Sequence, residues 1–246
     1  MRTRVRIFYR FLQLLIRVEF IRAIIEKACR FTTAVIGGES FYLESLRKTE
    51  DVDLVIDIGV YEGTPELYKV FGSSVFFLID PLPNYLKFAP KKFTQFPVVL
   101  GNTDGSRIFY HYGSEGASSC YTFTSRDGGY KSDLVSTSIV DCMRLDSFLV
   151  GHCAAHKSIG IKIDAQGAEY EILSSLKELP SSVKWIIVEN NVVDRYNSES
   201  HFSNITVLLL GLGFRFFNLS QQTMAYPSVA YDTIYLRDDH HFFGPK

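Results

Sequence analysis

Several acidic residues and glycines follow directly after short apolar runs, where proteins built on parallel strands bind their ligands. Residues 53–57 (DLVID) form such a run, and Gly59, Glu62 and Gly63 come soon after its final Asp57. Glycines permit a tight turn from strand to helix and a close approach of the backbone to a ligand. The spacing here is G-x-x-x-G, whereas a dinucleotide-binding turn has G-x-G-x-x-G and presents amides to a pyrophosphate.

A ligand without phosphates fits this turn better. S-adenosylmethionine carries a sulfonium and an amino-acid part, which need room and acidic or carbonyl partners. We therefore expect Asp57, Gly59, Glu62 and Gly63 to contact this methyl donor. The pattern is only moderately specific, since a purely structural turn matches it too.

The next two apolar runs each end in a polar residue suited to a nucleoside. Asp80 follows residues 75–79 and lies 21 positions after Gly59. A carboxylate there can accept both ribose hydroxyls, although an Asp before Pro81 also suits a turn. Asn102 follows residues 97–100 and could reach the adenine edge, with a plain turn around Asn102 as the alternative.

The fourth run leads into Lys162-Ile163-Asp164, and Glu169 follows in the first turn of the next expected helix. Lys162 and Asp164 point the same way along a strand because Ile163 lies between them. Asp164 is expected beside the methyl donor, where a carboxylate can take the proton of a hydroxyl during methyl transfer. Glu169 suits the positive end of the helix dipole.

The fifth run ends in Glu189 and Asn190. Together with Asp164 they form an all-oxygen ligand set of the kind that Mg²⁺ prefers, so a magnesium site is one hypothesis. The alternative is a hydrogen-bonded loop.

Strand-like and helix-like segments alternate along most of the chain, which predicts an α/β fold with a mostly parallel sheet. An antiparallel hairpin is expected at the C-terminal end, and the whole corresponds to a Rossmann-like, seven-stranded class I methyltransferase sandwich. Parallel strands are expected at 53–57, 75–79, 97–100, 159–163 and 183–188, helices at 64–71, 84–92, 168–179 and 201–210, antiparallel strands at 107–112, 117–124 and 136–143, and the hairpin at 214–219 and 231–236.

The charge is unevenly distributed, although the 246 residues carry a net charge of only −1. Residues 1–30 hold seven Arg and one Lys against two Glu, a local charge of +6, with apolar residues at helical spacing. Residues 1–50 are thus expected as an amphipathic helical segment and residues 51–246 as the methyltransferase domain. The helix either packs on the domain or a partner, or lies on an anionic membrane.

The cysteines and the overall charge argue against a disulfide-bonded, zinc-binding or nucleic-acid-binding protein. The four cysteines are scattered, so we expect reduced thiols in a cytoplasmic protein. If the amphipathic helix at residues 1–30 binds lipid, the protein is expected to be peripheral on the inner face of the membrane. His152, Cys153 and His156 lack a second ligand pair at zinc-site spacing, so a loop is the simpler interpretation. The balanced net charge does not favour nucleic acid.

From about residue 52 to 237 the chain resembles the FkbM family of methyltransferases. The resemblance is carried by residues 55–68 (VIDIGVYEGTPELY), 78–83 (LIDPLP), 99–105 (VLGNTDG), 117–119 (ASS), 144–146 (RLD), 161–169 (IKIDAQGAE) and 188–189 (VE). The family pattern often has Glu where this chain has Asp80 and Gln166. The first difference keeps a carboxylate, whereas the second removes one, and Gln166 is therefore given no catalytic role.

The resemblance implies O-methylation of a hydroxyl on a sugar, glycolipid or related natural product. It also implies that some relatives use Mg²⁺ bound at the ends of the fourth and fifth strands. Residues 112–131, rich in Gly, Ser and Tyr, are expected to cover the acceptor side. A non-catalytic subunit or scaffold of the same fold and, less favoured by the glycine spacing, an NAD-dependent oxidoreductase remain alternatives.

Overall fold

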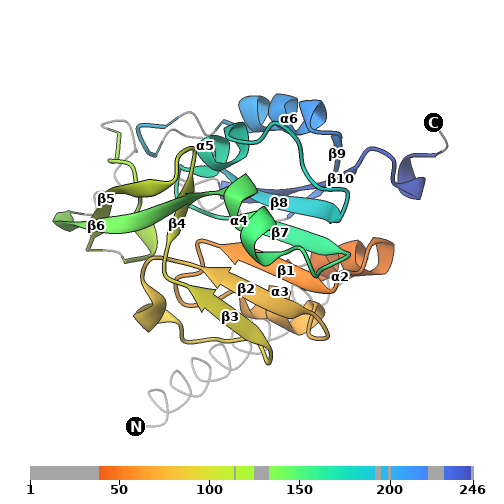
Figure 1. The fold of residues 1–246 in the computed structure, drawn as a ribbon, viewed down its shortest axis with the longest axis horizontal. Helices are drawn as coiled ribbons and strands as arrows, with labels where there is room; N and C mark the ends of the chain where they lie inside the picture. Colours follow the sequence, from red (N-terminus) through yellow and green to blue (C-terminus); the bar gives the residue numbers. More distant parts are fainter. Residues whose placement is uncertain are drawn as a thin grey trace, which may run out of the picture.

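The computed structural model describes residues 39–113, 115–124, 133–191, 195–198, 201–220 and 230–244. Its centre is a seven-stranded sheet with the order β3-β2-β1-β7-β8-β10-β9, which confirms the predicted Rossmann-like plan (Figure 1). The strands are β1 (Leu54–Ile58), β2 (Val75–Ile79), β3 (Phe93–Phe96), β7 (Ile159–Ile163), β8 (Val183–Asn191), β9 (Phe214–Leu219) and β10 (Ala230–Arg237).

The inner strands are parallel, and the C-terminal pair is antiparallel as expected. β1 pairs with β2 and β7, and β7 with β8, all in parallel. β10 runs antiparallel to both β8 and β9. Every residue of β1 and β7 is buried, because helices cover both faces of this part of the sheet.

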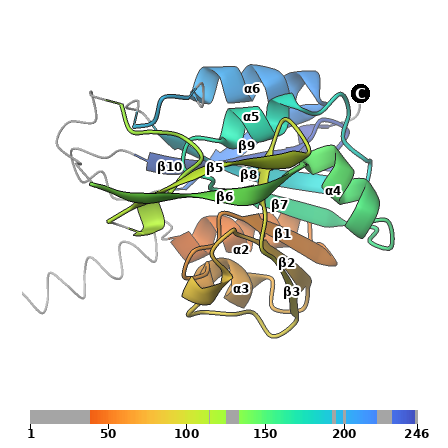
Figure 2. The same ribbon diagram turned by 60° about the vertical axis from the view of Figure 1, so that its left-hand side comes forward.

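Helices cover the two sheet faces unequally (Figures 1 and 2). On one face, α2 (Glu39–Thr49) and α3 (Pro65–Val70) enclose a core that includes Trp185 and Phe71. On the other, α4 (Leu145–His152), α5 (Glu169–Ser174) and α6 (Phe202–Gly211) enclose a larger core that includes Phe148. Tyr42, Leu43 and Leu46 of α2 are buried, so this helix packs as part of the domain.

A second, three-stranded sheet projects from the main sheet. It has the order β4-β6-β5 and contains β4 (Val99–Gly101), β5 (Gly105–Tyr112) and β6 (Leu134–Arg144). The expected strand at 117–124 is absent from the described residues of that stretch. Ser119 and Phe123 instead form isolated bridges, with Tyr110 and Tyr196 respectively. We call residues 115–124 the cover segment; residues 114 and 125–131 of the expected cover lie outside the described residues.

Two expectations about residues 84–100 were wrong. In place of a helix over 84–92 there is a short 3-10 turn, η1 (Pro83–Tyr85), followed by irregular backbone and the edge strand β3. The strand expected at 97–100 exists as β4, but it pairs with β6 rather than with the main sheet. Two further 3-10 turns are η2 (Glu115–Ala117) and η3 (His241–Phe243).

The amphipathic segment expected at 1–30 lies outside the described residues. Among the helices that the structure does describe, none has the length and apolar character needed to span a membrane.

Candidate active site

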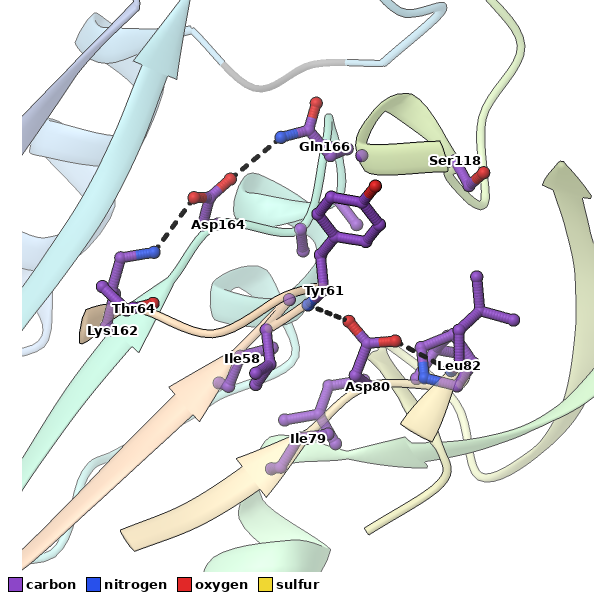
Figure 3. A pocket seen from close by; sticks show the side chains of 18 of the residues that line it. Ile58, Tyr61, Thr64, Ile79, Asp80, Leu82, Ser118, Lys162, Asp164 and Gln166 are labelled. Carbon is purple, nitrogen blue, oxygen red and sulfur yellow. Dashed lines mark hydrogen bonds and ion pairs between the residues drawn. The ribbon is translucent and has the colours of Figure 1, made fainter. Parts of the chain in front are cut away.

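A cavity of about 320 Å³ opens at the carboxyl ends of β1, β2 and β7, as Figure 3 shows. The order of strands reverses beside β1, which is where open α/β sheets bind their ligands. Of the residues expected to act, Gly59, Glu62, Gly63, Asp80 and Asp164 line this cavity. Among those that do not line it are Asp57, Asn102, Glu189 and Asn190.

Gly59 and Gly63 make room for backbone from other loops. Both have positive φ, +80° and +109°. A Cβ on Gly59 would lie 1.7 Å from the carbonyl oxygen of Asp164, and one on Gly63 would lie 2.1 Å from that of Phe88. Gly59 therefore allows the turn after β1 to pack directly against the loop that carries Asp164, and Gly63 allows it to pack against the backbone of Phe88.

Asp80 is held by backbone at the end of β2. Its Oδ2 accepts the N–H of Tyr61 and its Oδ1 accepts the N–H of Leu82, both at 2.8 Å. The residue is 9% exposed, and burial raises the pKa of its carboxyl although these N–H groups favour the ionised form. Each oxygen keeps a second lone pair, so Asp80 can also accept hydroxyl groups from the cavity.

Asp57 lies beneath the cavity. It is completely buried, and its Oδ2 accepts hydrogen bonds from Thr64 at 3.0 Å and Tyr68 at 2.7 Å. Its Oδ1 is 4.0 Å from the Lys162 ammonium. Burial raises the pKa of Asp57, with Lys162 and the two hydroxyls acting in the opposite direction. Asp57 therefore supports the cavity floor through Thr64 and Lys162, which do line the cavity.

Glu62 and Asn102 are engaged elsewhere. Glu62 forms an ion pair with Lys87 at 2.5 Å, and this contact lowers the pKa of Glu62. Asn102 is exposed, its N–H donates to Glu171, and its carbonyl accepts from Arg144. Asn102 does not line the cavity, although Val99 and Leu100 just before it do, so the structure gives no support to its expected role at adenine.

Asp164 is fixed at both carboxylate oxygens. Oδ2 accepts from Lys162 Nζ at 3.0 Å and Oδ1 accepts from Gln166 Nε2 at 3.0 Å (Figure 3). Burial alone would lower the pKa of Lys162, but the nearby carboxylates of Asp164, Asp57 and Asp232 outweigh burial and raise it well above its ordinary value. Lys162 is thus a permanent cation rather than a base.

The proposed magnesium ligands do not converge. Glu189 and Asn190 are neighbours in β8, so they point to opposite sheet faces. The Asn190 amide is fully buried and donates to Val188 and Thr233. In the part of the chain that the structure describes, no three His, Cys, Asp or Glu side chains form a metal-binding group. The residues therefore do not fit the expected magnesium site.

Residues 57–216 match the family model of the FkbM methyltransferase domain. The chain belongs to this family. It is therefore an S-adenosylmethionine-dependent methyltransferase. No curated protein sequence matches the chain.

Solved structures similar to this FkbM methyltransferase include two enzymes with bound ligands. One is magnesium protoporphyrin IX methyltransferase from Synechocystis PCC 6803 with bound SAM, at 10% identity, TM-score 0.41, and coverage of 89% of this chain and 84% of that one. The other is 1,6-didemethyltoxoflavin-N1-methyltransferase from Burkholderia thailandensis, at 8% identity, TM-score 0.41, and coverage of 88% and 85%.

Three residues that the sequence did not predict as site residues also line the cavity of this FkbM methyltransferase. Tyr61 and Gln166 both line the cavity, and both have positive φ, +46° and +52°, which is uncommon for residues other than glycine. Asp232 of β10 lines it too, directly opposite Glu189 in the sheet register. No signal in the sequence marks Tyr61, whereas alternation along β10 would have placed Asp232 on the face of Glu189.

Glu169 has a structural role within the loop after β7. Its carboxylate, which is fully buried, accepts the N–H groups of Ala165 and Gly167. These bonds fold the 165–167 backbone and thereby place Gln166. The K-I-D-x-x-G-A-E block thus encodes a loop shape as well as Asp164.

Proposed function

We propose that this protein transfers the methyl group of S-adenosylmethionine to a hydroxyl of a sugar, glycolipid or related natural product, with Asp164 as the general base. The observation that carries the proposal is the position of Asp164. Asp164 follows β7 and Asp80 follows β2, the two strands on either side of β1, and both residues line the same cavity.

The cavity suits the donor in three respects. Asp80 offers two buried carboxylate oxygens to the ribose hydroxyls. Val98, Leu100 and Phe109 give an apolar wall for a flat base. Asp164 and Asp232 line the cavity, and Asp57 and Glu189 lie beneath it near the Lys162 ammonium, so carboxyl groups outnumber cations on this described face and suit a cationic ligand.

Methyl transfer from a sulfonium is an in-line displacement, and alignment contributes much of the rate. The donor supplies an activated methyl group. A hydroxyl is a weak nucleophile, and its proton passes to Asp164 as the new C–O bond forms and the C–S bond breaks. Lys162 donates to Oδ2 of Asp164 and Gln166 donates to Oδ1, so both contacts hold the carboxylate in place.

Two measurements test this function. Calorimetry should show binding of S-adenosylmethionine and S-adenosylhomocysteine and none of NAD, which separates a methyltransferase from an oxidoreductase. Turnover of methyl-labelled donor on glycan and lipid extracts, followed by mass spectrometry of the labelled product, should place the methyl group on oxygen. Label on nitrogen or carbon contradicts the acceptor class, and donor binding without turnover favours the scaffold.

A separate proposal concerns residues 1–30, whose charge of +6 and apolar stripe suit an anionic surface on the cytoplasmic side of a membrane. The full chain should co-sediment with vesicles containing anionic lipid and be released as the salt concentration rises. Equal binding to neutral and anionic vesicles, or to neither, contradicts the proposal and favours packing on the domain.

A further inference from the structure

Gln166 connects the proposed base to the cover segment. Its Nε2 donates to Asp164 Oδ1 at 3.0 Å and lies 3.5 Å from Glu189 Oε2. Its Oε1 accepts from the Tyr196 hydroxyl at 2.8 Å. Its backbone carbonyl accepts from Ser119 Oγ at 2.6 Å. Gln166, whose backbone is in the left-handed conformation, thus contacts the site through its side chain and the cover segment through its backbone carbonyl.

Tyr196 is buried and anchors the same cover segment. Its hydroxyl lies 3.0 Å from the carbonyl oxygen of Ala117 as well as 2.8 Å from Gln166 Oε1. Its ring stacks on Phe123 with centroids 4.8 Å apart. Gly116 and Ser118, on either side of Ala117, line the cavity. Tyr196 therefore fixes the wall of the cavity and the Gln166 amide together.

Asp164 needs such support because its surroundings are strongly acidic. Lys162 of β7 holds one oxygen, while Glu189 of β8, Asp232 of β10 and Asp57 of β1 lie on the same face and repel the carboxylate. Only the Gln166 amide donates to Oδ1 among the described contacts. Without it, the Lys162 contact to Oδ2 alone would orient the carboxylate.

We propose that Gln166 is a positioning residue that orients Asp164 for proton transfer, and that Tyr196 acts through Gln166. The proposal rests on the proposed function, in which Asp164 is the base. It assigns a role to the position where the family pattern often has Glu and where this chain offers an amide donor instead.

The first readout needs neither donor nor acceptor. In ¹⁵N-labelled protein, the side-chain amide resonance of Gln166 is identified as the one absent from Gln166→Met. It should move in Tyr196→Phe and in Asp164→Asn, because each change removes or weakens one partner of the amide. It should stay in place in Tyr235→Phe, a matched control whose lost hydroxyl contact, 2.8 Å to Thr206, lies outside the cavity.

The second readout is methyl transfer to the extract fraction that the wild-type protein labels. Gln166→Met and Gln166→Glu keep the length of the side chain but lose the N–H donors. Both should lower the rate at saturating donor by about tenfold or more, since small misplacements of reacting groups are costly. The dissociation constant of S-adenosylhomocysteine should change by less than about threefold, as expected for a loss confined to the transition state.

A double variant tests whether Tyr196 acts through Gln166. Tyr196→Phe alone should slow transfer, and Tyr196→Phe combined with Gln166→Met should be no slower than Gln166→Met alone. Additive losses would overturn the coupling. A Gln166→Met protein with normal transfer, or an amide resonance unmoved by either partner's removal, would overturn the positioning role. Failure of the wild-type protein to bind donor would instead overturn the proposed function, because the resonance test does not depend on it.

Discussion

Replacement of Asp80 by Ala tests the donor site most directly. The carboxylate accepts two backbone N–H groups at 2.8 Å, and Asp80 lines the cavity. Ala removes the acceptors of the ribose hydroxyls and also the two bonds that join the turn after β1 to the turn after β2.

The expected loss of affinity follows from the two hydroxyl contacts. A hydrogen bond to a charged acceptor contributes about 1.5–3 kcal/mol, so losing two costs at least about 3 kcal/mol. Since about 1.4 kcal/mol corresponds to a factor of ten, the dissociation constant of S-adenosylmethionine should rise about 100-fold or more. The fold should lose less, because Tyr61 and Leu82 are partly exposed and water can replace the acceptor of their N–H groups.

Calorimetry measures the affinity, and Asp53→Ala provides the control. Asp53 also accepts two backbone N–H groups, from Lys157 at 3.1 Å and Ser158 at 3.4 Å, but lies at the opposite end of β1. Its replacement should lower the melting temperature without changing donor affinity. A folded Asp80→Ala protein that binds the donor as tightly as the wild type would refute the assignment of Asp80 to the ribose.

Three further predictions concern the base, the turn and the charges. Asp164→Asn should leave donor affinity within a few-fold and reduce turnover by roughly 10²-fold, the effect of losing a general base, measured in single-turnover assays. Gly59→Ala should destabilise the protein by more than about 2 kcal/mol in urea unfolding, because the new Cβ meets the Asp164 carbonyl at positive φ. Gly151→Ala, in a helix with nothing within 4 Å, should instead stabilise it by about 0.5–1 kcal/mol. In ligand-free protein the melting temperature of the wild type relative to that of Asp232→Asn should fall as pH rises above about 4, because burial raises the pKa of Asp232 in the fold, as it does that of Asp57, and its ionisation then costs stability.

Buried apolar runs were sufficient to predict the inner parallel strands of the central sheet. Residues 54–58 and 159–163 are buried throughout, and such runs have few alternatives to a parallel strand covered on both faces. Residues 84–96 were harder to predict because their structure depends on pairing with distant residues. Phe93–Phe96 becomes a strand by adding to the edge of β2, and local helix signals contain no information about that edge.

Local sequence patterns likewise predicted some residues of the candidate site and missed others. Asp80 and Asp164 were predicted because a residue directly after a parallel strand must lie at the ligand-binding edge. Asn102 was placed there by the same rule, which failed because β4 belongs to another sheet. The magnesium set joined Glu189 and Asn190, which are adjacent in a strand, so alternation of side chains alone argues against that set. Gln166 and Tyr196 meet across 30 positions, a contact that no local pattern contains.

The raised carboxyl pKa values connect folding to the choice of ligand. Burial and mutual repulsion raise the pKa of Asp57, Asp232 and Glu189, so folding favours their protonated forms relative to the unfolded chain, and this contribution to stability is lost as pH rises through the pKa of the folded state. A cationic ligand offsets this repulsion. S-adenosylmethionine bears a sulfonium charge that S-adenosylhomocysteine lacks, while the two are otherwise closely similar. The preference of the site for donor over product should therefore increase with pH as these carboxyl groups ionise, which calorimetry at several pH values can measure. A constant ratio of the two affinities would show that the acidic face does not contact the sulfonium, and the four carboxyl groups around Lys162 would then require another explanation.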